Sequence, residues 1–128
     1  MQDALLHAAL AARDHAHAPF SNFRVGAALE EENGHFHTGC NVENATYGLT
    51  ICAERVAVFK AVSEGQRQLK AIAVVTDAKT PTSPCGACRQ ILWEFCGDIE
   101  VILATTKGDV EMHRLASLFP RPFASNRR

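Results

Sequence analysis

Hydrophobic positions recur with a helical spacing near the start of the chain, and two later stretches are also predicted to be helical. In the first stretch, Leu6 and Leu10 lie four residues apart in an alanine-rich setting, as on one face of an amphipathic helix. The second and third stretches each end at a glycine, which is favoured directly after a helix. The predicted helices span residues 3–15, 53–64 and 86–96.

Strand patterns occupy the intervals between these helices. Residues 69–75 are almost continuously apolar, which is typical of a central strand covered on both faces. Asn33-Gly34 is a strong hairpin-turn signal, and Lys107-Gly108-Asp109 is a second tight turn. The predicted strands span residues 25–29, 35–38, 69–75, 99–104 and 110–113.

The order of these elements predicts a single α/β domain over residues 1–128. The strand–helix–strand order of residues 69–104 implies a parallel pair joined by a right-handed crossover. The turn at residues 107–109 can join only antiparallel neighbours, because a parallel connection needs about a dozen residues. We therefore expect one mixed five-stranded sheet with helices on both faces and with its last two strands antiparallel.

Composition agrees with a globular domain and narrows the choice of partners. The chain is 47% hydrophobic and 21% charged, and its net charge of −1 gives no reason to expect a nucleic-acid partner. Its longest apolar runs are too short to span a membrane, and residues 1–6 lack the features of a signal peptide. Five cysteines, an odd number, argue for reduced thiols and a cytoplasmic location.

Two short motifs carry the chemistry, Cys52-Ala53-Glu54 and Pro84-Cys85-Gly86-Ala87-Cys88. Three thiols can bind one zinc ion and leave its fourth position open, as catalytic zinc sites do. Each motif lies at the start of a predicted helix, so both helix dipoles favour the thiolates that zinc requires. Glu54, two residues from the first thiol, is placed to act on a water molecule at the open position.

Other interpretations of the cysteines remain open at this point. Cys85 and Cys88 could form a redox pair, although the upstream motif and the lack of a preceding tryptophan argue against it. A closed structural zinc site would need a fourth ligand, such as Cys40, Cys96 or a histidine.

Two arginines directly follow residues of these motifs. Arg55 and Arg89 could each donate a hydrogen bond to a thiolate sulfur and so offset the negative charge of three thiolates. The alternative is that both are ordinary surface residues.

With Pro84-Cys85-Gly86-Ala87-Cys88-Arg89-Gln90, the Cys-Ala-Glu motif resembles the zinc deaminase signature, in particular that of short, homotetrameric cytidine deaminases. The resemblance covers nearly the whole chain in five ordered blocks. Besides the two motifs, it includes residues 18–28, residues 39–45 and Phe119-Pro120-Arg121-Pro122-Phe123.

The resemblance implies a role for each motif residue. Cys52, Cys85 and Cys88 would bind one zinc ion per subunit. Glu54 would move protons between the attacking water and N3 of the cytosine ring, and Arg55 would balance the charge around the metal.

The resemblance also implies which residues bind the nucleoside. Asn41 and Glu43 would hold the ribose, since residues two apart in an extended segment point the same way. The carboxylate of Glu43 would repel a nucleotide's phosphate. Phe23 would pack on the base, with core packing as its alternative role, and Ala53 would line the substrate site.

The last of the five matching blocks, residues 119–123, implies an oligomer whose subunits share active sites. Phe123 resembles a C-terminal phenylalanine that the family inserts into a neighbouring subunit, and Tyr47 belongs to a loop that also reaches between subunits. The alternative for Phe123 is a simple anchor of the tail.

We therefore expect zinc-dependent deamination of cytidine and 2'-deoxycytidine in pyrimidine salvage. The alternative is a deaminase of modified cytidines or nucleoside antibiotics on the same scaffold. Polynucleotide editing is disfavoured by the late tight turn and the near-neutral charge. A catalytically inactive zinc module is disfavoured by Glu54.

Overall fold

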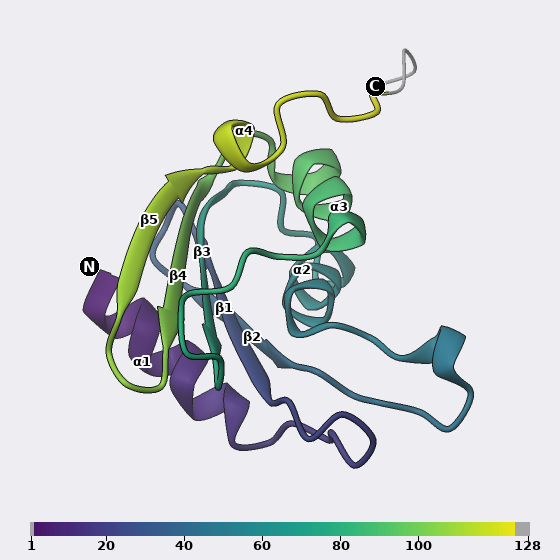
Figure 1. Cartoon of the computed structure of the whole chain (residues 1–128). Helices are drawn as coiled ribbons and strands as arrows, with labels where there is room; N and C mark the ends of the chain where they lie inside the picture. Colours follow the sequence, from purple (N-terminus) through teal and green to yellow (C-terminus); the bar gives the residue numbers. More distant parts are fainter. Residues whose placement is uncertain (1, 125–128) are drawn as a thin grey trace.

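The computed structural model describes residues 2–124 and shows one five-stranded sheet with helices on both faces (Figure 1). The elements, in chain order, are α1 (Gln2–Arg13), β1 (Val25–Glu31), β2 (Phe36–Cys40), the 3₁₀ turn η1 (Tyr47–Leu49), α2 (Ala53–Ser63), β3 (Leu69–Thr76), α3 (Gly86–Cys96), β4 (Glu100–Thr105), β5 (Val110–Arg114) and α4 (Leu115–Leu118).

The sheet has the strand order β2-β1-β3-β4-β5. Strands β3 and β4 are parallel, and all other neighbours, including the last pair β4 and β5, are antiparallel. These pairings confirm the mixed five-stranded sheet, the parallel pair and the antiparallel last pair predicted from the sequence. The register of β1 against β3 shifts between Glu30 and Glu31, where Lys70 of β3 is skipped, which is a β-bulge near the start of β3.

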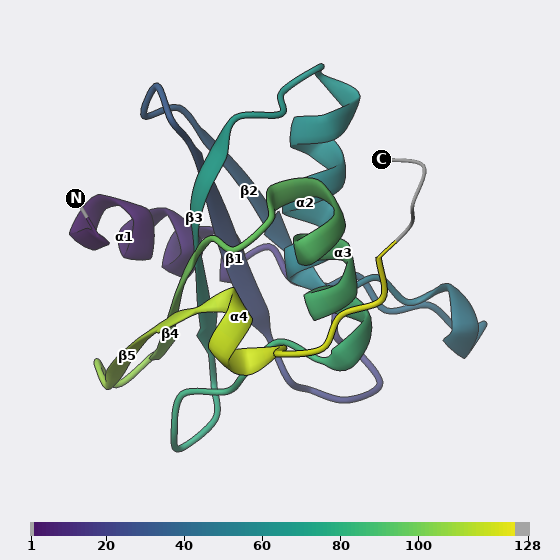
Figure 2. The ribbon, with the colours of Figure 1, turned by 90° about the horizontal axis from the view of Figure 1, so that it is seen from above.

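Helices cover both faces of the sheet, with α1 on one face and α2 and α3 on the other (Figure 2). An apolar core lies between the sheet and the helices on each face. The larger core lies under α2 and α3 and contains Leu29, Ile72, Val74 and Leu103. The smaller core lies under α1 and contains Leu5, Val75 and Ile102. Because neighbouring residues of β1, β3 and β4 face opposite layers, nearly every residue of these strands is buried.

Two glycines let the helices approach the sheet closely. A Cβ atom on Gly26 would lie 2.0 Å from the carbonyl oxygen of Ala9 in α1. A Cβ atom on Gly39 would lie 2.5 Å from the carbonyl oxygen of Ala53 and 2.7 Å from the backbone nitrogen of Ala57. The start of α2 therefore rests directly on the backbone of β2.

Several element boundaries differ from the sequence prediction. Strand β2 continues to Cys40, because Gly39 and Cys40 keep pairing with β1 where a loop was expected. Helix α1 ends at Arg13, two residues early, and Arg13 forms an ion pair with Asp77. Helix α4 was not predicted, since four residues are too few to show a period. Among the described residues, no helix has both the length and the apolar character needed to cross a membrane.

Candidate active site

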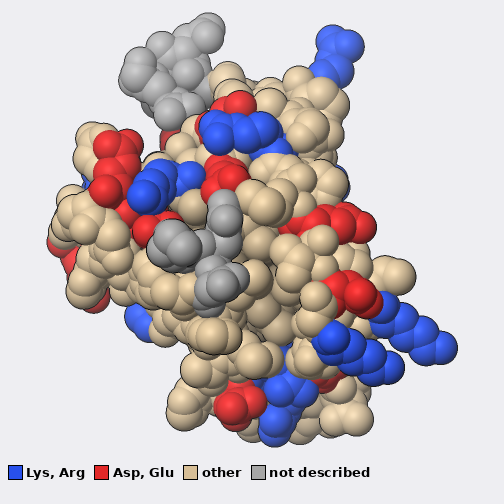
Figure 3. All heavy atoms as spheres, turned by 90° about the vertical axis from the view of Figure 1, so that its left-hand side faces the viewer, with Lys and Arg blue, Asp and Glu red and all other residues tan. Residues whose placement is uncertain are grey.

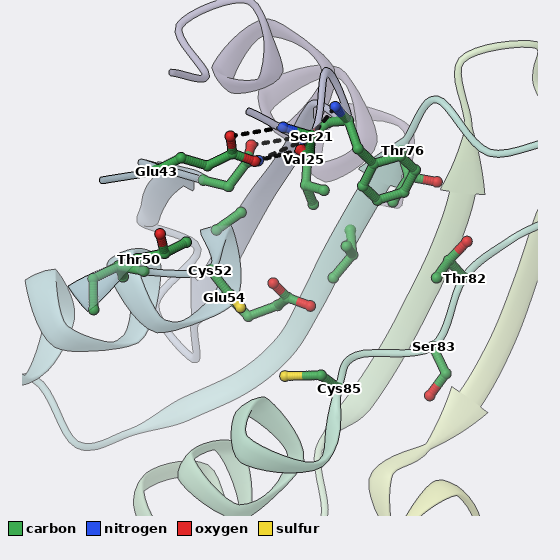
Figure 4. Close-up of a pocket in the computed structure, with 15 residues that line it drawn as sticks. Ser21, Val25, Glu43, Thr50, Cys52, Glu54, Thr76, Thr82, Ser83 and Cys85 are labelled. Atoms are coloured by element: carbon green, nitrogen blue, oxygen red, sulfur yellow. Dashed lines mark hydrogen bonds between the residues drawn. The ribbon is translucent and has the colours of Figure 1, made fainter. Parts of the chain in front are cut away.

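A pocket of about 300 Å³ opens at the N-terminal ends of α2 and α3 (Figure 4). This volume lies at the lower end of the range for small-molecule sites. Its lining includes seven of the candidate site residues named from the sequence, and these seven are Phe23, Asn41, Glu43, Cys52, Ala53, Glu54 and Cys85.

The three motif cysteines converge at this pocket. Cys52 and Cys85 are the N-cap residues of α2 and α3, and Cys88 lies in the first turn of α3. Their sulfur atoms all lie within 4.8 Å of one another, and those of Cys85 and Cys88 are 3.4 Å apart. Four ligands about 2.3 Å from a zinc ion would be separated by about 3.8 Å, so these thiols fit a tetrahedral site.

The thiol cluster has three members among residues 2–124, so a zinc ion held by them would keep its fourth position for water or substrate. Cys96, one of the alternative ligands, packs instead against the larger core, where burial raises the pKa of its thiol to about 12. Cys40 lies at the end of β2. The arrangement therefore matches a catalytic zinc site better than a closed structural one.

The surroundings of Cys52 favour its thiolate form, which is the form that binds zinc. Hydrogen bonding from Cys88, supported by the charge and hydrogen bond of Arg55, lowers the pKa of Cys52 to about 5. The same Cys52–Cys88 contact, together with burial, raises the pKa of Cys88. Zinc binding would displace the protons that remain on these thiols.

Glu54 lies beside the thiols with its side chain buried. Figure 4 shows its carboxyl group pointing into the pocket between Cys52 and Cys85. Only 6% of the residue is exposed, and burial raises the pKa of Glu54 to about 7. A carboxyl group with such a pKa can both accept and donate a proton near neutrality.

The two arginines differ in what they contact. The Nη2 atom of Arg55 donates to Cys52 Sγ at 3.4 Å, as the sequence analysis expected. For Arg89, whose role the sequence left open, the described contacts lie away from the thiols. Its Nη1 atom donates to the carbonyl oxygen of Leu118 at 2.9 Å, and its guanidinium lies 5.7 Å from the ring centre of Phe119. Arg89 therefore anchors the segment after α4.

Asn41 and Glu43 both line the pocket, but each also has a structural partner. The side chain of Asn41 accepts from the backbone nitrogen of Val25 at 2.9 Å and donates to the carbonyl oxygen of Phe23 at 2.8 Å. It thereby fixes the position of Phe23, whose side chain also lines the pocket.

The carboxylate of Glu43 is bound by the loop before β1. It accepts hydrogen bonds from the backbone nitrogens of Phe20 and Ser21, at 2.9 Å and 3.1 Å, and from the Ser21 hydroxyl. The Ser21 hydroxyl is the main cause that lowers the pKa of Glu43. Glu43 therefore brings a fixed negative charge to the rim of the pocket.

Sequence reasoning missed part of the pocket wall. Thr82 and Ser83 come from the loop before α3, and Thr76 from the end of β3 (Figure 4). The available signal was a run of hydroxyl residues directly before the second cysteine motif. Ser21 was also missed, because its contact with Glu43 spans 22 residues of sequence.

Phe123 lies outside the pocket of its own chain and is 74% exposed. The side chain of Gln90 in α3 holds its backbone at both ends, donating to the carbonyl oxygen at 2.9 Å and accepting from the nitrogen at 3.2 Å. The tail is thus attached to the helix that carries Cys88, while the phenyl ring faces solvent.

Comparisons with known proteins agree with this geometry. Residues 1–105 match the family model described as the cytidine and deoxycytidylate deaminase zinc-binding region. The chain is 54% identical over 114 residues to a cytidine deaminase of Sporosarcina psychrophila, covering 88% of this chain and 84% of the relative. It is 49% identical over 122 residues to a cytidine deaminase of Halalkalibacterium halodurans, covering 94% and 92%.

A solved structure is similar over almost the whole chain. The crystal structure of cytidine deaminase from Burkholderia pseudomallei superposes with a TM-score of 0.94 at 48% sequence identity. The match covers 96% of this chain and 99% of that one.

Proposed function

Because the chain belongs to the cytidine and deoxycytidylate deaminase family, a family of zinc-binding hydrolytic deaminases, we propose that it converts cytidine and 2'-deoxycytidine to uridine and 2'-deoxyuridine. Water is consumed and ammonia is released. The observation that carries the proposal is the buried carboxyl group of Glu54, in a 300 Å³ pocket beside three convergent thiols.

Each residue of the centre has a distinct part in this reaction. Cys52, Cys85 and Cys88 would hold the zinc ion, which, when bound, supplies Lewis acidity to an attacking water molecule. Glu54 accepts a proton from that water and delivers it to N3 of the base, which makes C4 more electrophilic. It then carries the second proton to the departing amine.

Arg55 would offset part of the negative charge of the zinc site. Three thiolates and one divalent ion carry about one net negative charge, which opposes the acidification of water. The guanidinium of Arg55, 3.4 Å from the Cys52 sulfur, withdraws electron density from that thiolate and offsets this charge.

The far wall of the pocket would bind the nucleoside. Glu43 accepts hydrogen bonds from ribose hydroxyls and repels a phosphate, which favours a nucleoside over a nucleotide. Asn41 supports the ribose and holds Phe23, which packs against the base. Ala53, the first residue of α2, places a backbone N–H with no intrahelical partner at the pocket.

The assembled enzyme would be a homotetramer with shared active sites. Support comes from large exposed side chains, which are Phe20, Tyr47, Leu49 and Phe123. Phe20 and Tyr47 contact each other, and exposed apolar groups that lie together mark protein–protein contacts. Native mass spectrometry tests the assembly, and Phe123→Ala should lower turnover without removing zinc; full activity of this variant would leave Phe123 as a tail anchor.

The proposed role is salvage of pyrimidine nucleosides in the cytoplasm, without nucleic-acid partners. Five free cysteines favour a reducing compartment. On the face shown in Figure 3, acidic and basic side chains are interspersed and form no basic track.

The test is an absorbance assay of zinc-loaded protein on a panel of cytosine compounds. Cytidine and 2'-deoxycytidine should be deaminated, deoxycytidylate much less, and modified cytidines and cytosine-bearing antibiotics report the alternative substrates. Glu54→Gln should retain zinc and lose about 10²–10⁴-fold in kcat. No turnover of either nucleoside by the zinc-loaded protein would refute the proposal.

A further inference from the structure

A second cluster of metal-binding side chains lies at the opposite end of α2 from the three cysteines. Glu31 ends β1, His35 follows the hairpin turn, and His37 lies in β2. One ligand atom from each lies within 4.8 Å of the other two. Glu64, the C-cap residue of α2, contacts the imidazole of His37. Eleven helical residues, about 17 Å, separate the two ends of α2, so this cluster is distinct from the cysteine site.

The backbone brings these side chains together. At the end of β1 the pairing with β3 skips Lys70, so that Glu31 lies opposite Leu69. The hairpin is closed by the backbone nitrogen of Glu31, which donates to the carbonyl oxygen of His35 at 2.8 Å. His35 and His37 lie two apart, and their rings meet edge to face at 5.2 Å.

The imidazole of His37 lies between two carboxylates. Its Nε2 atom is 2.5 Å from Glu31 Oε2, and its Nδ1 atom is 3.6 Å from Glu64 Oε1. A metal-binding histidine commonly has this environment, with the metal at one ring nitrogen and a carboxylate facing the other. The ligating nitrogen must be unprotonated, which leaves the proton on Nδ1, toward Glu64.

Burial and charge also favour a cation here. The side chains of His37 and Glu31 are only 3% and 6% exposed, whereas the third ligand, His35, is exposed and connects the site to solvent. Within residues 2–124, the ion pairs of Glu31 and Glu64 involve His37 alone, without lysine or arginine. A buried carboxylate is costly without a cation, and a helix C-terminus disfavours the negative charge of Glu64.

We infer that Glu31, His35 and His37 form a second binding site for a divalent first-row transition-metal ion such as zinc, with Glu64 orienting His37. Imidazole and carboxylate are ligands that zinc and its neighbours share. The ion enters between Glu31 and His37, and their 2.5 Å contact opens to about 3.3 Å, as ligand bonds of about 2.0 Å require. The bound ion links the β1–β2 hairpin to the end of α2 and stabilises the fold.

The experiment begins with protein that holds one zinc ion per chain at the cysteines. Cobalt(II) is then added, and bound metal is measured by elemental analysis and by visible absorption. We expect a second equivalent with weak d–d bands and without the near-ultraviolet thiolate charge transfer of a cysteine site. His35→Gln and Glu64→Gln should each weaken this binding at least about tenfold, while the cysteine-bound zinc and deaminase activity stay unchanged.

The variants are chosen so that folding does not obscure the result. His35 and Glu64 are both exposed, and His15→Gln, at an exposed histidine outside the cluster, is the matched control. Added zinc should raise the melting temperature of the parent protein and of His15→Gln, but not of His35→Gln. A missing second equivalent, a second equivalent with a thiolate band, or binding unchanged in His35→Gln would each overturn the inference. The cluster would then be a hydrogen-bonded pair that closes the hairpin.

Discussion

The contact between Gly39 and α2 gives a sharp test of how the fold positions the active site. An alanine Cβ at this position would lie 2.5 Å from Ala53 O, 2.7 Å from Ala57 N and 2.9 Å from Val56 Cβ. Ordinary contact begins near 3.4 Å, so β2 and α2 must separate by about 0.9 Å at the closest point. Two of these three atoms belong to the helix backbone, and a rotamer change cannot relieve the clash.

The size of the effect follows from these distances. Overpacking of this kind costs about 1–3 kcal/mol, which lowers the melting temperature of a chain of this length by about 4–11 °C. The displaced segment begins next to Cys52 and contains Glu54, and a misplacement of about 1 Å can cost about 10²-fold in rate. Gly39→Ala should therefore lose both stability and kcat.

Thermal unfolding and the cytidine assay measure these two losses. Gly48→Ala is the matched control for the melting temperature, because a Cβ atom on Gly48 meets nothing within 4 Å. If Gly39→Ala matched Gly48→Ala in melting temperature and the parent protein in kcat, the close approach of α2 to β2 would not position the catalytic groups.

Three further variants or reagents test single contacts. Glu43→Gln should raise KM for cytidine by about 10–100-fold, since it removes a charged hydrogen-bond acceptor, while the exposed control Glu32→Gln leaves KM unchanged. Arg55→Gln should lower kcat at least about tenfold by removing the charged donor to Cys52, and an unchanged kcat would make Arg55 a structural residue. Burial raises the pKa of the half-buried Cys96 to about 12, so its thiol stays protonated at pH 8. Mass spectrometry should find Cys96 alkylated by iodoacetamide far more slowly in the folded than in the denatured protein, and equal labelling rates would contradict the raised pKa.

Much of the fold could be predicted because its signals are local. The apolar run of β3, the glycines that end α2 and α3, and the tight turn before β5 each determine one element or one connection. The end of β2 depends instead on pairing with β1 across the hairpin, which the polar composition of residues 39–50 concealed. Helix α4 depends on the position of Leu115, which is buried against the larger core.

The site was predictable to the extent that spacing determines it. Cys85 and Cys88 lie on one turn at the start of α3, and Cys52 lies at the start of α2. The three thiols therefore come together once the N-terminal ends of these two helices lie side by side. Arg89 shows the limit of this reasoning. Arg89 and Arg55 both follow a motif residue, but the C-terminal segment packs beside α3 and offers Arg89 the carbonyl oxygen of Leu118.

The hairpin of β1 and β2 contacts α2 near both ends of the helix. A change at one end should affect catalysis, whereas a change at the other should affect stability alone. Gly39 contacts the first turns of α2, which hold Cys52 and Glu54 in place, whereas His37 contacts Glu64 at its far end. An ion at the Glu31 cluster would add a cross-link only at that far end, and the contact at Gly39 already sets the distances among the catalytic groups. The second metal should therefore raise the melting temperature and leave kcat unchanged, whereas Gly39→Ala should change both.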